Sequence, residues 1–169
     1  MRWDDLFADL EGQLHATQGA QFMADVADMT RAERASVELA ARVVASAGQS
    51  VTVTLSDGTT VSGVIVDAST QWLLLGASGP QTLIPLPAVT MLSGLSGQAA
   101  PLSEVERRLS LGYALRALSR DRSHVVVHTA SGQVRGVINA VGADHLQLLT
   151  EAGVQVTVPH GAIICLRGA

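Results

Sequence analysis

Apolar residues alternate with polar ones between Val51 and Leu75, and a similar pattern returns between His124 and Leu149, 73 residues further along the chain. A side-chain period of two is typical of strands that bury one face. At this spacing the matching pairs are Val53 and Val126, Val61 and Val134, Gly63 and Gly136, Val64 and Val137, Ile65 and Ile138, Leu73 and Leu146, and Leu75 and Leu148. Self-similarity at a fixed spacing predicts a duplicated structural unit.

Each repeat is predicted to hold five short strands. Asp57-Gly58 marks a hairpin turn after the first strand, because glycine adopts positive φ without a steric clash. Glycine inside the second strand indicates a sharp bend or a close backbone approach. One inserted residue then changes the spacing to 74, so that Pro85 meets Pro159. Proline cannot donate to a strand ladder, so these residues predict a tight turn before the short final strands, 89–92 and 163–166.

An apolar stripe precedes both repeats. Large side chains recur three and four residues apart, which is the spacing of one face of an amphipathic helix over residues 1–29: Trp3, Leu6, Phe7, Leu10 and Leu14. Phe22, Val26 and Met29 continue the spacing after a weak point at residues 17–19. Such a stripe must be buried, either against the repeats of the same chain or against another chain.

Each repeat is also predicted to begin with a helix. Thr30 with Glu33, and Ser103 with Glu106, have the spacing of a capping box at a helix N-terminus. The predicted organisation is therefore an N-terminal helix over 1–29, a helix and barrel over 30–92, a Gly/Ser/Ala-rich linker over 93–102, and a helix and barrel over 103–169.

A helix followed by five bent strands, with Gly58 in the hairpin, Gly63 in the second strand and a short turn before the last strand, resembles the Sm and Sm-like (LSm) proteins, which include the bacterial Hfq chaperone. The resemblance covers 30–92 and 103–166. It implies two tandem five-stranded barrels, RNA binding, and assembly by pairing of barrel edges. At the places of the second Sm motif this chain has Leu86-Pro87-Ala88 and His160-Gly161-Ala162. The opening, MRWDDLFADLEGQL, resembles a family of uncharacterised actinobacterial proteins.

The repeats predict a mainly β protein of two small domains that carry helices, and the composition agrees with two apolar cores. The chain has 169 residues, of which 47% are hydrophobic and 15% charged, so it has enough apolar side chains to fill two cores. We expect a cytoplasmic protein without a membrane segment, because no apolar run approaches the roughly 18 residues of a membrane span. The single Cys165 lies in an apolar final strand, and we expect it to be buried and inert.

Basic residues gather in the segment that precedes the second set of strands. They are Arg107, Arg108, Arg116, Arg120 and Arg122, whereas residues 1–30 hold six acids and one arginine. The arginines could contact phosphates, with Arg135 and Arg167 beside them, or receive the acidic N-terminal helix, or form a solvated helix face. A net charge of −4 and only 3% aromatic residues argue against nucleic-acid binding.

Catalytic signatures are missing from the sequence. It has no nucleophile elbow, phosphate loop or dinucleotide fingerprint. His124 and His128 point to one face of a strand but lie roughly 13 Å apart, and no Cys/His cluster has zinc spacing. Small barrels are filled by their own side chains. We therefore expect no enzyme activity, no metal, no cofactor and no small-molecule substrate.

The leading hypothesis is a regulatory or scaffold module that self-associates or binds a protein partner. An open small barrel exposes unpaired backbone groups on its edge strands. Two repeats in one chain can pair one edge internally, which leaves one free edge at each end. The alternative hypothesis is an RNA- or DNA-binding regulator that uses the arginines.

Overall fold

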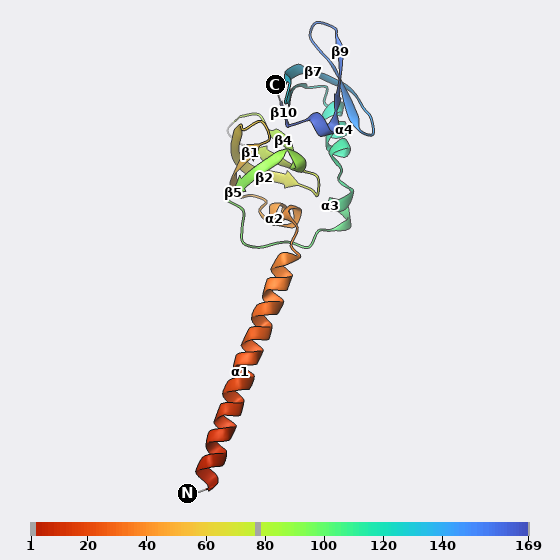
Figure 1. Cartoon of the computed structure of the whole chain (residues 1–169). Helices are drawn as coiled ribbons and strands as arrows, with labels where there is room; N and C mark the ends of the chain where they lie inside the picture. Colours follow the sequence, from red (N-terminus) through yellow and green to blue (C-terminus); the bar gives the residue numbers. More distant parts are fainter. Residues whose placement is uncertain (1–2, 77–78, 169) are drawn as a thin grey trace. The chain divides into compact units, whose positions relative to one another are not determined.

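The computed structural model describes residues 3–76 and 79–168, with side chains from residue 16 onward. The chain divides into two compact units, residues 1–37 and 38–169. The first unit is one helix, and the second contains all ten strands and three further helices (Figure 1). The expectation of a mainly β protein with helices is confirmed for this part of the chain.

Helix α1 runs without a break from Trp3 to Ala35. It passes through the predicted weak point at residues 17–19 and through Thr30, so the prediction that a second helix starts at Thr30 is wrong. The Thr30 hydroxyl donates to the Val26 carbonyl at 2.8 Å, a bond that a threonine inside a helix makes to the preceding turn. The capping-box spacing at Thr30 therefore does not mark a helix start.

The second unit begins with the short helix α2, Leu39–Ala45. Before the second repeat come α3, Glu104–Arg108, and α4, Leu111–Arg120. The predicted capping box at Ser103 is confirmed, because Glu106 N donates to Ser103 Oγ at 3.3 Å and Ser103 N donates to Glu106 Oε2 at 2.6 Å. Ser110 caps α4 by accepting from Tyr113 N, and this second cap separates α4 from α3.

The five strands predicted for each repeat are present. The first repeat contains β1 (Ser50–Leu55), β2 (Thr60–Ala68), β3 (Trp72–Gly76), β4 (Thr82–Pro85), the 3₁₀ turn η1 (Leu86–Ala88) and β5 (Val89–Ser93). The second contains β6 (His124–Thr129), β7 (Gly132–Val141), β8 (His145–Leu149), β9 (Gln155–Pro159), η2 (His160–Ala162) and β10 (Cys165–Gly168).

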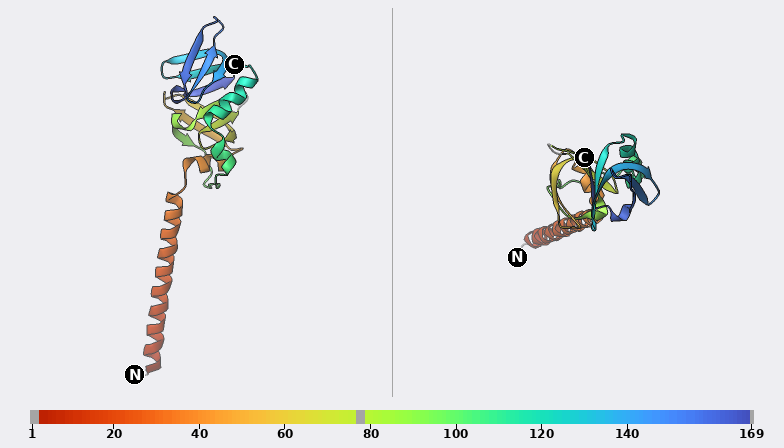
Figure 2. Two further views of the ribbon diagram at one scale, coloured as in Figure 1. Left: turned by 90° about the vertical axis from the view of Figure 1, so that its right-hand side faces the viewer. Right: turned by 90° about the horizontal axis from the view of Figure 1, so that it is seen from above.

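All ten strands belong to one antiparallel sheet, in the order β5-β1-β2-β3-β4-β10-β6-β7-β8-β9. Both halves of this order have the same internal connectivity, so the repeat in the sequence is also a repeat in topology. The sheet is open, because β5 and β9 each pair with a single neighbour. Figure 2 shows the strands of the two repeats side by side.

The repeats are joined by β4 and β10, which pair Leu83 with Leu166 and Thr82 with Arg167. Gly168 N extends the junction by donating to Gln81 O at 3.3 Å. The expectation that one repeat edge is paired inside the chain is thus confirmed.

The glycines inside the second strand of each repeat permit close backbone packing. A Cβ at Gly63 would lie 2.7 Å from the Gly76 carbonyl oxygen. A Cβ at Gly136 would collide with the Leu149 carbonyl oxygen. Both strands also contain an irregular register, between Ile65 and Asp67 in β2 and at the equivalent place in β7, which is typical of a strongly bent strand.

The two hydrophobic cores exchange residues across the junction. Trp72 and Leu83 of the first repeat are buried in the core of the second, while Ile164 and Cys165 are buried in the core of the first. The Trp72 indole Nε1 donates to the Leu109 carbonyl at 2.9 Å. The expectation of a buried Cys165 is confirmed at 2% exposure. No helix among the described residues is long and apolar enough to cross a membrane.

Candidate functional surfaces

The two end strands of the sheet, β5 and β9, have equivalents that are already paired inside the chain. At the spacing of 74 residues, β5 corresponds to β10 and β9 corresponds to β4. Because β4 and β10 pair with each other, the same two kinds of edge that join the repeats are exposed at opposite ends of the sheet. A free edge presents unpaired N–H and C=O groups to any strand of suitable shape.

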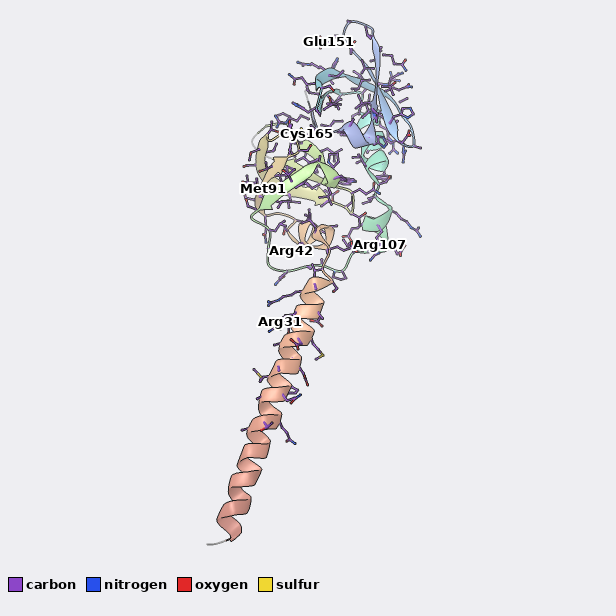
Figure 3. The ribbon with its side chains drawn as sticks, viewed as in Figure 1. Arg31, Arg42, Met91, Arg107, Glu151 and Cys165 are labelled. Atoms are coloured by element: carbon purple, nitrogen blue, oxygen red, sulfur yellow. The ribbon has the colours of Figure 1, made fainter. Side chains whose placement is uncertain are left out.

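Apolar side chains accompany the unpaired backbone of these edges. Met91 on β5 is 66% exposed, although its equivalent Cys165 is 2% exposed (Figure 3). All four residues of β4 are buried, whereas only Val158 is buried in β9. Strands β4 and β10 are covered at the internal junction, whereas their equivalents β9 and β5 are uncovered at the two ends of the sheet.

The predicted N-terminal interface belongs to α1. The side chains of Trp3, Leu6, Phe7, Leu10 and Leu14 lie outside the described residues. Further along the helix Phe22, Met23 and Met29 are each more than 60% exposed within their own unit. This part of α1 presents apolar side chains that no described contact covers.

The arginines proposed for nucleic-acid binding come from several elements of the second unit. Arg107 and Arg108 are on α3, Arg116 and Arg120 on α4, Arg122 in the following turn, Arg135 on β7 and Arg167 on β10. Arg108 forms an exposed ion pair with Glu104, and Arg135 forms one with Glu151, both at 3.6 Å. Arg167 is half-buried, with an Nε atom that has no hydrogen-bond partner among the described residues.

Near the start of β10, the charges of Asp57 and Arg167 lie close enough to His128 and Cys165 to change their pKa values. Cys165 lies opposite His128 across the β10–β6 pair. Burial raises the pKa of the Cys165 thiol, which keeps it protonated and weakly nucleophilic. Burial, and then the charge of Arg167, lower the pKa of His128. Within residues 16–76 and 79–168, no three or more His, Cys, Asp or Glu side chains are arranged to hold a metal ion.

The sequence predicts that edge strands are exposed, but it does not show that β5 and β9 are the free ones or that Met91 is exposed. The apolar character of Met91 is also typical of a core residue, so the sequence gives no sign of its exposure. The repeat could have identified these edges, because the spacing of 74 residues matches β5 with β10 and β9 with β4. Comparison with known proteins adds no further identification: no protein-family model matches the chain, and no curated protein matches it.

Proposed function

We propose that the chain is a non-catalytic scaffold module built of two Sm-like repeats, which assembles with further copies of itself by strand addition. The observation that carries the proposal is the β4–β10 pair, in which one repeat already recognises the other through its edge. The free strands β9 and β5 are the equivalents of these two strands in the other repeat, so the β4–β10 pair is a template for a contact between β9 of one chain and β5 of another.

The internal junction provides a register for the contact between chains. Arg167 pairs with Thr82 inside the chain, and Leu166 pairs with Leu83. At the spacing of 74 residues, Ser93 and Val156 are the equivalents of Arg167 and Thr82. The same register therefore pairs Ser93 of one chain with Val156 of the next, and Leu92 with Thr157. Pairing in this register extends the sheet from one molecule to the next and covers Met91.

The proposed assembly is head-to-tail, because a β5 edge meets a β9 edge rather than another β5. Heterologous contacts of this kind either close into a ring or continue as a filament. The exposed apolar residues of α1 supply a second surface for contacts between copies, and protein partners with an exposed strand would compete for the same edges.

Disulfide cross-linking tests the register directly. A chain with Ser93→Cys and Val156→Cys should form a ladder of covalent multimers under mild oxidation, because directly opposed residues in a strand pair are within reach of a disulfide. The matched control, Ser93→Cys with Thr157→Cys, shifts one cysteine to the opposite face of its strand and should cross-link poorly. Single-cysteine variants account for any contribution from Cys165.

Light scattering on the unmodified chain supplies the complementary measurement. A discrete mass above that of one chain is expected at micromolar concentration. A monomer at that concentration, together with equal cross-linking of the matched and shifted cysteine pairs, would rule out edge-to-edge assembly.

A further inference from the structure

A cleft lies between the two repeats and borders residues of both cores. The first repeat lines it with η1 and the turn before β3, and the second lines it with the start of α4 and with η2. Its volume is about 840 Å³, which is within the range of about 300–1,000 Å³ typical of small-ligand sites. Its charged or titratable lining residues are Arg116 and His160, and its lining contains no carboxylate.

Gly112 leaves space between these two basic side chains. A Cβ at this position would lie 3.4 Å from Arg116 Nη1, 3.8 Å from Arg116 Nη2 and 3.5 Å from His160 Cε1. The guanidinium and the imidazole therefore converge on one point at the first turn of α4. A larger residue at position 112 would occupy that point.

Hydrogen-bond donors at this point lack acceptors. Leu111 N donates to Gln71 Oε1 at 3.0 Å and Tyr113 N donates to Ser110 Oγ at 3.2 Å. The Gly112 N–H between them has no hydrogen bond among the described residues. In the same part of the chain, the Arg116 guanidinium has no ion pair.

His160 adds a ring nitrogen that is also unsatisfied. Its Nε2 atom is excluded from solvent and has no hydrogen-bond partner among the described residues. Protonation would place a positive charge on the ring, whose Cε1 atom lies next to the Gly112 position.

We propose that the cleft binds the phosphate group of a small phosphorylated molecule, held by the Gly112 N–H, the Arg116 guanidinium and the His160 imidazole. A tetrahedral oxyanion offers several acceptor oxygens to donors that approach from different directions, and a guanidinium binds two of them at once. The remainder of the cleft, with Leu86 and Ile163 in its lining, accommodates the apolar part of the ligand. This site is independent of the proposed assembly.

Binding should be coupled to proton uptake at His160. Burial lowers the pKa of this imidazole most strongly; its hydrogen bond to the His145 backbone and the Asp144 carboxylate oppose that effect, and the charges of His145 and Arg116 lower the pKa further. A bound anion favours the protonated ring. The affinity for an anion of constant charge should therefore increase as the pH falls toward and below about 6.5, the ordinary pKa of a histidine.

The test is a ¹⁵N NMR titration of the full chain with phenyl phosphate, inorganic phosphate and sulfate. Phenyl phosphate should shift the Gly112 amide saturably and bind at least about tenfold more tightly than inorganic phosphate, because its ring also enters the cleft. Equal affinities would overturn the phosphomonoester assignment in favour of a free-phosphate site. Sulfate keeps a constant charge and reports the pH dependence, which His160→Gln should abolish.

Two variants and one control separate the site from general charge effects. Arg116→Gln and Gly112→Ala should each weaken phenyl phosphate binding at least about tenfold, and alanine is itself favourable in a helix. Arg120→Gln removes the next arginine of α4, which does not line the cleft, and should bind as the unmodified chain does. The amide spectrum of each variant verifies folding. Absence of a saturable shift, or equal affinity in folded Arg116→Gln, would overturn the proposal.

Discussion

Met91 and Cys165 occupy equivalent positions in the two repeats, yet Met91 is 66% exposed and Cys165 only 2% exposed. The difference follows from the places of their strands in the sheet. Strand β10 lies between β4 and β6, whereas β5 has a neighbour on one side only. At the internal junction β4 covers the outer edge of β10. The equivalent edge of β5 has no neighbouring strand.

Replacing Met91 with lysine should weaken assembly and leave the fold intact. A charge that must lose its hydration at a strand-to-strand contact costs more than about 1.4 kcal/mol, so the dissociation constant should rise at least about tenfold. Exposed substitutions usually change stability by less than about 0.5 kcal/mol. Sedimentation velocity across a concentration series measures the dissociation constant, and urea unfolding measures the stability.

Val105→Lys is the matched control for this prediction. Val105 is 65% exposed and lies on α3 rather than on an end strand. The Val105→Lys substitution introduces the same charge as Met91→Lys at a similarly exposed apolar position. If both variants dissociate equally, net charge rather than the β5 edge governs assembly.

Substituting alanine for Gly136 should destabilise the second repeat. The new Cβ meets the Leu149 carbonyl group and the Thr150 Cα atom, and backbone cannot move aside as easily as a side chain. Overpacking of this kind costs about 1–3 kcal/mol, measured as a lower midpoint in urea. Gly97→Ala is the control, because no atom lies within 4 Å of its Cβ position. Equal stability of the two variants would show that β7 and β8 can separate without cost.

The repeat explains why so much of the fold could be predicted. Strand alternation and the glycine in each second strand are local patterns, and they occur twice, so each occurrence supports the other. The Thr30 pattern misled because a threonine followed three residues later by glutamate also fits inside a helix, where the hydroxyl bonds to the preceding turn. Residues around Thr30 are helical because α1 continues through them, and a four-residue motif cannot predict whether a longer helix continues.

The cleft between the repeats could not be predicted in the same way. Gly112 and His160 are far apart in the sequence and become neighbours only when α4 packs beside η2. The interior of each predicted barrel could be considered from the sequence, because small barrels are filled by side chains, but no pattern in the sequence locates a cavity at the junction of two repeats. Gly112 lies in the first turn of α4, and a glycine at such a place does not by itself indicate a neighbouring cavity.

Acidification should destabilise the chain through His128. Burial, and then Arg167, lower the pKa of this imidazole, while Asp57 raises it. The unfolded chain therefore binds a proton at a higher pH than the folded chain, so the stabilising contribution is present above about pH 6.5 and is lost as the pH falls below it. The pKa values of Asp57 and Asp144 are lowered too, but an aspartate titrates at about pH 4 even when unperturbed, so these carboxyls do not contribute between about pH 8 and pH 5.

Urea unfolding between about pH 8 and pH 5 checks this prediction. The midpoint should fall with pH, and His128→Gln should reduce the slope. The variants are also compared at about pH 8, where the imidazole is neutral in both states, and any difference there reports lost packing rather than titration. Adding His160→Gln should flatten the profile further, because burial also lowers the pKa of that ring. An unchanged slope in the double variant would assign the acid sensitivity to other groups.

Binding of nucleic acid is the alternative that assembly leaves open, and it can be tested on α3. Arg108 is ion-paired with Glu104, and Arg107 contacts the Leu102 carbonyl at 3.5 Å. Both arginines would have to exchange these contacts for phosphates. We therefore expect no saturable binding of single-stranded RNA or duplex DNA in fluorescence anisotropy at low salt, consistent with a net charge of −4. The opposite result would be saturable binding that weakens as salt is added. If the Arg107→Ala, Arg108→Ala variant then lost both affinity and salt dependence, the phosphate contacts would lie on α3, and the result would favour a nucleic-acid regulator.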